Sequence, residues 1–331
     1  MRAIERCWSR LCAAHLVLWP LSLAFGAAAA LRRAVYRSGL LAVERLPVPV
    51  VVVGNIAVGG SGKTPLVIRL VEHLRRQGWR PGVVSRGYGG TARAPLGVTP
   101  DSDPGTTGDE PLLIARRTGA PVWVGRDRPA AARALLAAHP GCDVIVSDDG
   151  LQHYRMARDV EIAVVDTARG WGNGLLLPAG PLRERPDRLQ RVDAVVLHGT
   201  DAAPDDLPPG PALVRMRLVP GTACNLADPS RTQPLDALRG QPLVAVAGIG
   251  NPERFFATLR AAGLEFAARP FRDHHVYRAA DLATDDATAI VMTEKDAVKC
   301  TAFASGRMWV VPVDADVDPA LGDLVCNRIR R

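Results

Sequence analysis

The chain has 331 residues, of which 47% are hydrophobic and 23% are charged, so we exclude a disordered protein and expect two globular domains. Its net charge of +7 favours an anionic partner, such as a phospholipid surface, a phosphorylated substrate or nucleic acid. No arginine-rich tract alternates with aromatic residues, which argues against nucleic acid. Six cysteines without CxxC spacing indicate free thiols in a reducing compartment and argue against a disulfide framework or a zinc site.

Residues 11–31 form an uncharged stretch with arginines on both sides. As a helix rising about 1.5 Å per residue, it would reach roughly 30 Å, enough to cross a bilayer. Polar and small residues interrupt it, however, and Arg2, Arg6 and Arg10 would form one basic stripe towards anionic headgroups. We therefore predict a membrane-associated helix within residues 1–37 that lies on the membrane surface. A membrane span, a cleaved signal peptide and a helix packed on the soluble part are the alternatives.

Residues 48–70 carry the clearest motif of the chain. The β-branched run at residues 50–53 predicts a buried parallel strand, which leads through a glycine-rich turn into an amphipathic helix. Such a junction cradles phosphate with backbone N–H groups, while Lys63 reaches the outer phosphates and Thr64 can ligate Mg²⁺. Ala57 stands where the strict pattern has glycine, a change that many nucleotide-binding loops allow. We predict a nucleoside triphosphate site made of Ala57, Val58, Gly59, Gly60, Ser61, Gly62, Lys63 and Thr64.

A second strand is predicted at residues 81–84, and it ends in a glycine-rich loop that carries Tyr88. Further on, residues 106–111 place Asp109 and Glu110 at the start of a helix, where the helix dipole favours acidic side chains. Taken alone, the first feature is equally well a flexible surface turn, and the second an ordinary capped helix start.

The next acidic pair follows an apolar strand. A third strand at residues 121–125 and an alanine-rich helix at residues 127–139 precede a fourth strand at residues 143–147, which delivers Asp148 and Asp149. Nucleotide enzymes place the Mg²⁺ partner at such a strand end, downstream of the phosphate loop. The combination of this pair with Lys63 and Thr64 is more informative than either motif alone.

The middle of the chain continues the strand pattern and then loses it. Residues 160–166 and 194–197 are predicted as strands, and the Gly/Pro-rich connection between them as a substrate-facing loop. Residues 213–219 alternate apolar and basic side chains, as a half-exposed strand does. No periodicity follows up to residue 234. We therefore predict a phosphate-loop domain over residues 38–219, a linker over residues 220–236 and a second α/β domain over residues 237–331.

A second βα series fills the predicted second domain. The strand at residues 243–247 leads into a helix capped by Asn251, and the strand at residues 289–292 ends in Thr293-Glu294-Lys295-Asp296. That segment resembles a guanine-reading loop, but its lysine stands one place late, so we interpret it as a helix cap. The adjacent His274 and His275 could bind a metal, yet no third ligand is near in the sequence. A strand at residues 308–313 and a helix at residues 319–330 close the chain.

Taken together, these motifs resemble one family, the tetraacyldisaccharide 4'-kinases that act on lipid A precursors in Gram-negative bacteria. The resemblance spans nearly the whole chain, and its specificity lies in the ordered set of motifs. They are residues 54–65 (GNIAVGGSGKTP), 85–89 (SRGYG), 108–111 (GDEP), 148–153 (DDGLQH), 177–184 (LPAGPLRE), 273–275 (DHH) and 292–297 (MTEKDA). Arg185, where proline often stands, and Leu151, where phenylalanine is common, depart from the family pattern without touching the expected chemistry.

The resemblance implies transfer of the ATP γ-phosphoryl group to the 4'-hydroxyl of a tetraacyldisaccharide 1-phosphate at the cytoplasmic face of the inner membrane. It implies two αβα sandwich domains, the first a parallel sheet of the P-loop NTPase kind, joined by a small β-stranded linker. It also implies that Asp109 is the general base and that His274 assists it. Candidate metal ligands are Thr64, Glu110, Asp148 and Asp149, and candidate substrate-binding residues are Tyr88, Gln152, His153, Asn173 and Arg183. No obligate protein partner is expected.

Two other functions are compatible with the phosphate loop. One is a GTPase or ATPase switch, for instance a metallochaperone, although the guanine motif and a CxxC metal motif are missing. The other is a nucleotide-gated membrane adaptor without catalytic activity. A switch hydrolyses nucleotide in the absence of lipid, and an adaptor binds ATP without forming a phosphorylated lipid, so both are separable from a kinase.

Overall fold

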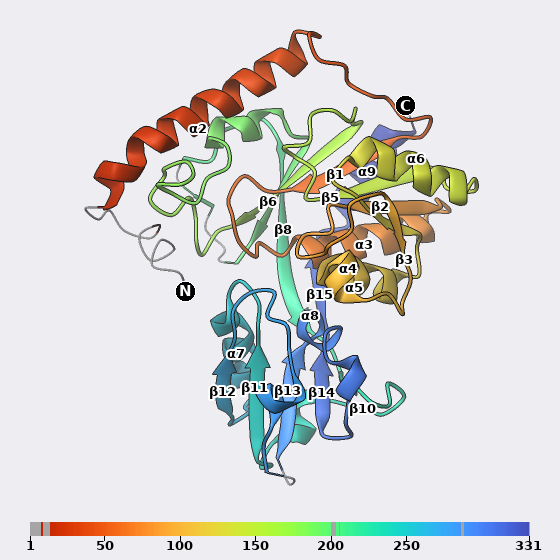
Figure 1. Ribbon diagram of the computed structural model, residues 1–331, viewed down its shortest axis with the longest axis vertical. Helices are drawn as coiled ribbons and strands as arrows, with labels where there is room; N and C mark the ends of the chain where they lie inside the picture. Colours follow the sequence, from red (N-terminus) through yellow and green to blue (C-terminus); the bar gives the residue numbers. More distant parts are fainter. Residues whose placement is uncertain (1–7, 9–13, 200–202, 205, 286–287, 331) are drawn as a thin grey trace.

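Two β-sheets organise residues 8, 14–199, 203–204, 206–285 and 288–330, which the computed structural model describes. The larger sheet has the strand order β15-β8-β7-β6-β1-β5-β2-β4-β3, and the smaller has the order β10-β9-β14-β13-β11-β12. Figure 1 shows the larger sheet above the smaller, with β8 and β15 running down towards the smaller one. Most strand pairs in both sheets are parallel, which confirms the predicted mixed α/β class.

The larger sheet forms the core of what we call the first domain. Its strands are β1 (Val50–Gly54), β2 (Pro81–Ser85), β3 (Leu96–Val98), β4 (Val122–Val124), β5 (Val144–Asp148), β6 (Val160–Asp166), β7 (Ala194–His198), β8 (Ala212–Pro220) and β15 (Val313–Val317). The four valines of β1 are at most 1% exposed, as expected for a central parallel strand between β5 and β6. Because the carboxyl ends of parallel strands share one edge, the loops after β1, β2, β5, β6 and β7 converge there.

Helices cover both faces of this sheet. On one face pack α3 (Lys63–Arg76), α5 (Asp109–Thr118) and α9 (Ala320–Ile329), whose apolar sides join one large core. On the other lie α6 (Arg128–Ala138) and the long connections after β5 and β6, around a second core. Two short elements, α4 (Pro104–Thr107) and η1 (Pro186–Arg191), complete the domain.

The smaller sheet forms the second domain. Its strands are β9 (Ala223–Asn225), β10 (Thr232–Gln233), β11 (Leu243–Ala247), β12 (Ala267–Pro270), β13 (Ala289–Thr293) and β14 (Met308–Val311). Its helical elements are η2 (Leu235–Leu238), α7 (Pro252–Ala261), η3 (Ala279–Leu282), α8 (Glu294–Ala297) and η4 (Thr301–Phe303). Apolar clusters line both faces of the sheet, so this domain has a core of its own.

The domain boundaries differ from the predicted ones. The single strand expected at residues 308–313 breaks at Pro312, which cannot donate a ladder hydrogen bond, and β15 pairs antiparallel with β8 in the larger sheet. The alternation of Val313, Ala315 and Val317 with aspartates was the sequence signal for this half-buried strand. Residues 313–330 therefore belong to the first domain, and the predicted linker carries β9 and β10. The second domain is an insertion over residues 221–312.

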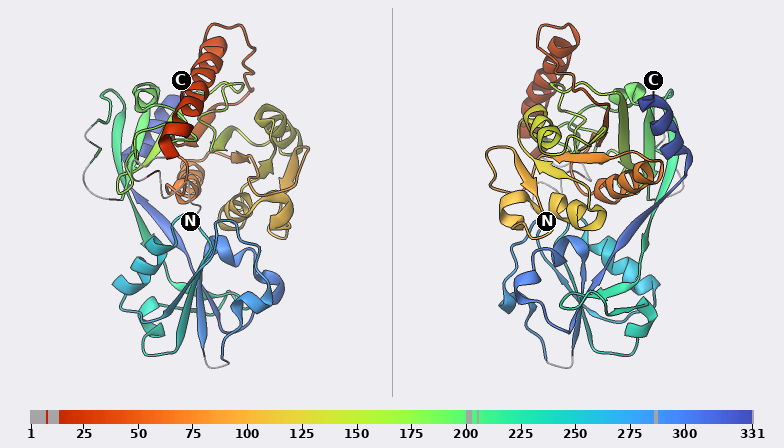
Figure 2. Two further views of the ribbon diagram at one scale, coloured as in Figure 1. Left: turned by 60° about the vertical axis from the view of Figure 1, so that its left-hand side comes forward. Right: turned by 90° about the vertical axis from the view of Figure 1, so that its right-hand side faces the viewer.

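A long helix, α2 (Ala14–Arg37), lies over the loops of the first domain, at the end of the molecule away from the second domain (Figures 1 and 2). Ser22 faces inward, where its hydroxyl donates to the Leu176 carbonyl at 2.7 Å. Val17, Trp19 and Leu23 face outward, with 75%, 52% and 55% of their surfaces exposed. Among the described residues, no helix combines the length and apolarity needed to cross a membrane. The arginine stripe predicted at residues 2–10 lies outside the described residues.

Candidate active site

The turn between β1 and α3 has the backbone conformation of a phosphate cradle. Gly59 and Gly62 adopt φ angles of 118° and 84°, which side-chain-bearing residues rarely adopt, and Gly62 immediately precedes the helix. Asn55 braces the turn by donating to the Ser61 hydroxyl at 3.1 Å. Gly62 brings no capping side chain, so the first N–H groups of α3 are free for an anion. Of the eight residues of the predicted nucleotide site, residues 57–62 lie on this turn, and Lys63 and Thr64 are the first two residues of α3.

The carboxylate pair lies beside the cradle, because β5 is the neighbour of β1 and pairs Asp148 with Val53. Lys63 lies 3.6 Å from the Asp149 carboxylate, and Arg183 donates to both oxygens of that carboxylate at 2.9 Å. Burial alone would raise the pKa of Asp149, but Lys63 and Arg183 outweigh it and lower the pKa to about 2. Asp149 is therefore ionised and holds both basic side chains at the mouth of the cradle.

Asp148 differs from its neighbour. Ser85 donates to one of its oxygens at 3.0 Å, while the other, Oδ1, is buried and has no hydrogen-bond partner among the described residues. Burial, together with the nearby Glu110 and Asp149, raises the pKa of Asp148 to about 6. An orphaned carboxylate oxygen among other carboxylates, with the Thr64 hydroxyl at the start of α3, is a donor set that fits Mg²⁺.

Asp109 and His274 are 165 positions apart in the chain and meet between the two domains. His274 Nδ1 lies 3.0 and 3.1 Å from the two Asp109 carboxylate oxygens. Asp109 begins α5 and is 4% exposed; Gly108 before it has a φ of 88° and passes so close to the Tyr88 carbonyl that a Cβ would lie 2.6 Å from it. The loop that carries Tyr88 thus sets where α5 begins.

The electrostatics of this pair favour an ion pair. Burial would raise the pKa of Asp109, but the hydrogen bond to His274 and the charge of Lys295 lower it overall. Burial would lower the pKa of His274, but the hydrogen bond to Asp109 raises it overall. The two shifts agree: the carboxylate stays ionised and the imidazole is readily protonated, so Nδ1 donates to Asp109.

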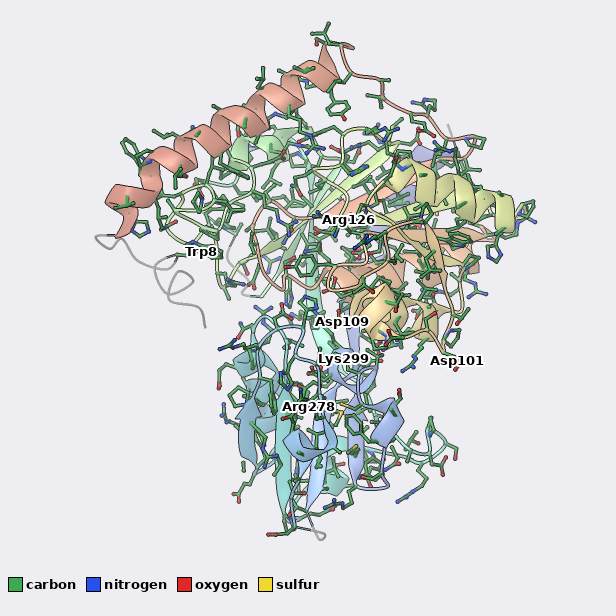
Figure 3. The ribbon with its side chains drawn as sticks, viewed as in Figure 1. Trp8, Asp101, Asp109, Arg126, Arg278 and Lys299 are labelled. Carbon is green, nitrogen blue, oxygen red and sulfur yellow. The ribbon has the colours of Figure 1, made fainter. Side chains whose placement is uncertain are left out.

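Contacts across the domain interface join the Asp109–His274 pair to the cradle. Glu110 accepts from Lys295 at 2.9 Å and is close enough to Asp148 to raise the pKa of that carboxyl. A Cβ added to Gly250 would lie 3.1 Å from the Gly60 nitrogen and 3.5 Å from Asp273, the neighbour of His274. Figure 3 shows Asp109 just above Lys299, where the first domain meets the second. The groups therefore form one site at the sheet edge.

Three of the predicted substrate-binding residues surround this site. Arg183 holds Asp149, and Gln152 donates to the Asn55 carbonyl at the base of the cradle at 3.0 Å. Tyr88 is 64% exposed, and its ring centroid lies 5.0 Å from that of His274. An exposed aromatic ring beside the partly buried His274 is available to an incoming molecule.

The other two are held elsewhere by the fold. Asn173 accepts from the Leu175 nitrogen and donates to the Ala179 carbonyl, so its amide braces the loop beneath α2. His153 is partly buried; burial, followed by the charges of Arg128 and Arg158, lowers its pKa to about 4. The structure joins neither residue to the cradle by a described contact.

Three basic residues near the site were not predicted as functional. Arg128 is 2% exposed and donates to the Val84 carbonyl and, at 3.4 Å, to the Asp149 carbonyl. A cation in the first turn of α6 opposes the helix dipole, and this was a usable sequence signal. The helix cap predicted at Thr293 is confirmed, since its hydroxyl accepts from the Asp296 nitrogen. The same segment, however, also directs Lys295 and Lys299 at the first domain.

A metal site at the paired histidines is not supported. His275 instead lies 3.1 Å from Asp281 and stacks on Phe271. Within the described part of the chain, no group of three or more His, Cys, Asp or Glu side chains could hold a metal ion. Mg²⁺ is commonly held by one or two carboxylates together with substrate phosphates and water, so this finding is compatible with a metal at Asp148.

Comparison with known proteins gives one consistent result. The family described as "Tetraacyldisaccharide-1-P 4'-kinase" matches residues 14–330. A "Tetraacyldisaccharide 4'-kinase" of Azoarcus sp. is 57% identical over 95% of this chain and 92% of its own length, and one of Methylobacillus flagellatus is 48% identical over 100% and 96%. A crystal structure of LpxK from Aquifex aeolicus in complex with ATP superposes with a TM-score of 0.81 at 27% identity, covering 94% of this chain and 98% of that one. The chain therefore belongs to the tetraacyldisaccharide 4'-kinase family.

Proposed function

We propose that the chain transfers the γ-phosphoryl group of ATP to the 4'-hydroxyl of tetraacyldisaccharide 1-phosphate, a step in lipid A biosynthesis. The observation that carries the proposal is the Asp109–His274 pair, in which Asp109 is buried and His274 is partly buried, and which lies between the phosphate cradle and the exposed Tyr88. A sugar hydroxyl is a poor nucleophile until a base accepts its proton, and a carboxylate can do so. The family membership supports the same substrate pair.

The roles of the chain's own residues follow from their positions. The N–H groups after Gly59 and Lys63 hold and align the outer phosphates, and Asp149 keeps the Lys63 ammonium at the cradle. Asp109 accepts the proton of the attacking hydroxyl at a carboxylate oxygen. His274, protonated beside it, orients the carboxylate and balances its charge. Bound Mg²⁺, held by Asp148 and Thr64 with Glu110 or Asp149 nearby, would neutralise the charge that develops on the phosphates.

The nucleotide-switch and adaptor alternatives are separable from the kinase by product. Labelled ATP incubated with a defined tetraacyldisaccharide 1-phosphate in detergent is expected to give a bisphosphorylated lipid, scored by thin-layer chromatography and mass. The control is the same protein with ATP or GTP but without lipid, where phosphate release is expected to be slow. Fast hydrolysis without lipid, or binding of ATP without a lipid product, would contradict the proposal.

We also propose that α2 rests on the cytoplasmic face of the inner membrane. Its inward face is polar or small at His15, Ser22 and Gly26, whereas Val17, Trp19, Leu21 and Leu23 point away from the protein. This pattern is the reverse of a helix that packs on a core through its apolar stripe. Basic Arg32 and Arg37 at its carboxyl end suit anionic headgroups. A lipid substrate requires such a surface, because its acyl chains stay in the bilayer.

A further inference from the structure

Two lysines of the second domain reach across the interface to the first turn of α5. Lys295 lies in α8 and Lys299 lies in the turn that follows this helix, and both project towards Asp109 and Glu110. Lys295 donates to Glu110 at 2.9 Å and to Asp273 at 3.2 Å. Lys299 Nζ lies 3.8 Å from Asp109 Oδ2 and 2.9 Å from Asp296 Oδ1. Each lysine thus links one carboxylate of α5 to one carboxylate of the second domain.

Lys299 is held from behind by the core of its own domain. Its side chain is 8% exposed and lies over the Tyr277 ring, with the ammonium 5.0 Å from the ring centroid. Asp296, its partner, is fully buried and accepts from the Thr293 hydroxyl at 2.7 Å and from the Gly248 nitrogen at 2.9 Å. The position of the ammonium is therefore fixed by the second domain before the first domain meets it.

The charges at the interface are arranged so that they determine how α5 meets α8. At the start of α5, two carboxylates face the two lysines, while further along the same helix Arg117 donates to both Glu294 oxygens at 2.8 Å. Reversing or shifting the contact would bring like charges together, which is costly at partly buried sites. The first turn of α5 is therefore placed by the charges of the second domain.

We propose that Lys299, anchored on Asp296, is a positioning residue for the carboxylate of Asp109, and that Lys295 plays the same part for Glu110. Docking of the second domain then assembles the proton acceptor as well as covering it. The inference rests on the proposed function, in which Asp109 takes the proton of the sugar hydroxyl. It adds that the charge supplied by these lysines sets the turnover rate, whereas the cradle sets nucleotide binding.

A purely structural role for Lys299 is the rival explanation, because its charge also compensates the buried Asp296. The pair of variants Lys299→Met and Asp296→Asn/Lys299→Met separates the two roles. Methionine keeps the unbranched apolar stem and removes only the ammonium, and asparagine keeps an acceptor for Thr293 and Gly248. The single variant leaves a buried carboxylate unpaired and is expected to lower both melting temperature and kcat, whereas the double variant removes that charge and is expected to recover the melting temperature.

The decisive readout is kcat in the double variant, measured with ATP and the lipid acceptor. We expect kcat to stay about 10- to 100-fold below wild type, with the KM for ATP changed less than about threefold, because the interaction matters for the transition state and not for nucleotide binding. Recovery of kcat together with stability would overturn the proposal. Lys295→Met is expected to lower kcat in the same manner, and an unchanged kcat would overturn the part assigned to Lys295.

The matched control is Glu294→Gln, which breaks the Arg117 ion pair of the same interface without touching Asp109. We expect its kcat within about threefold of wild type, and a loss as large as that of the lysine variants would overturn a specific role for them.

Two further measurements distinguish a failure of this inference from a failure of the proposed function. Wild-type protein that forms no lipid product overturns the proposed function, and the inference with it. A fully active Asp109→Asn variant overturns the inference through the base assignment alone.

Discussion

Asp109 combines two properties that rarely occur together, since it is almost completely buried and yet its pKa is lowered. Burial raises the pKa of Asp109, but His274, Lys295 and Lys299 together lower it by more. We predict that Asp109→Asn lowers kcat by about 10² to 10⁴, as expected for the loss of a base, while the dissociation constant for ATP stays near that of wild type. Calorimetric titration with ATP and steady-state kinetics test both halves. Weak nucleotide binding combined with a normal kcat would contradict the assignment.

Lys63 is expected to behave differently, because it lies at the cradle and contacts Asp149. Lys63→Met should weaken ATP binding and lower kcat together, since the ammonium serves the phosphates in the bound state and during transfer. The same titration and kinetics measure this, with Lys63→Arg as the charge-preserving control. A variant with normal ATP affinity would place the lysine away from the phosphates.

His153 gives the fold an acid-sensitive point. Its pKa is lowered to about 4, chiefly by burial and then by Arg128 and Arg158, so the folded state binds its proton less readily than the unfolded state, with a pKa of 6.5. Stability from the neutral ring is therefore present above pH 6.5 and is lost as pH falls from there towards 4. The free energy of unfolding, measured in urea at pH 7 and at pH 5, should fall less between these two pH values for His153→Gln than for the control His139→Gln. The control alters an exposed histidine. Equal losses would contradict this.

At the residue scale, the sequence predicted what lies in short motifs and missed what long-range contacts create. The cradle residues and the Asp148–Asp149 pair were identifiable because a strand, a turn and a helix start fix their geometry locally. The pairing of Asp109 with His274 was predicted from the family resemblance, because local sequence spacing cannot predict a contact between residues 165 positions apart. Lys299 could not be found, because its role depends on how two domains meet.

At the level of single elements, α2 makes the sharpest prediction. Trp19 and Leu23 are one helical turn apart on its exposed face, and burying each in the headgroup region contributes about 1.5–3 kcal/mol at most. We expect Trp19→Ser/Leu23→Ser to lower the fraction of protein that pellets with anionic vesicles by about tenfold or more. Leu213→Ser, which alters an equally exposed leucine on β8, is the control. Unchanged pelleting of the α2 variant would exclude this helix as the contact.

The success of element prediction followed the strength of the periodic signal. Long apolar runs such as β1 and β6 were located to within a residue, because only a buried strand fits them. The junction between β14 and β15 at Pro312 was not located, because a continuous apolar run hid the change from one sheet to the other. Three-residue strands such as β3 and β9 carry too few positions for any period, and only their neighbours determine them.

Considered as a whole, the molecule is two domains whose interface is joined by several ion pairs between buried and partly buried side chains. Besides the contacts at α5, Arg254 of α7 donates to Asp166 at 2.8 Å and to the ring of His198 at 2.9 Å, at the ends of β6 and β7. Burial, followed by Arg254, lowers the pKa of His198, so its neutral ring can accept that bond.

We predict that Arg254→Met loosens the docking of the second domain without unfolding either domain, because Asp166 loses its partner at the interface while both cores are untouched. Amide hydrogen exchange should accelerate in α7 and at the ends of β6 and β7. Arg260→Met, on the exposed side of the same helix, is the control. Protection that is unchanged at all three places would contradict a role for Arg254 in docking.

The pairing of β15 with β8 has a consequence for synthesis on the ribosome. When Pro220 has been translated, the edge of β8 has no neighbour, and its partner strand follows only after the inserted domain, about 5 to 20 s later at bacterial elongation rates. For that interval the nascent chain exposes an open sheet edge together with the apolar patch that α9 later covers. A chaperone that binds extended segments could bind the exposed edge of β8 during this interval. A chain truncated after Pro312 would keep that edge and the apolar patch exposed permanently.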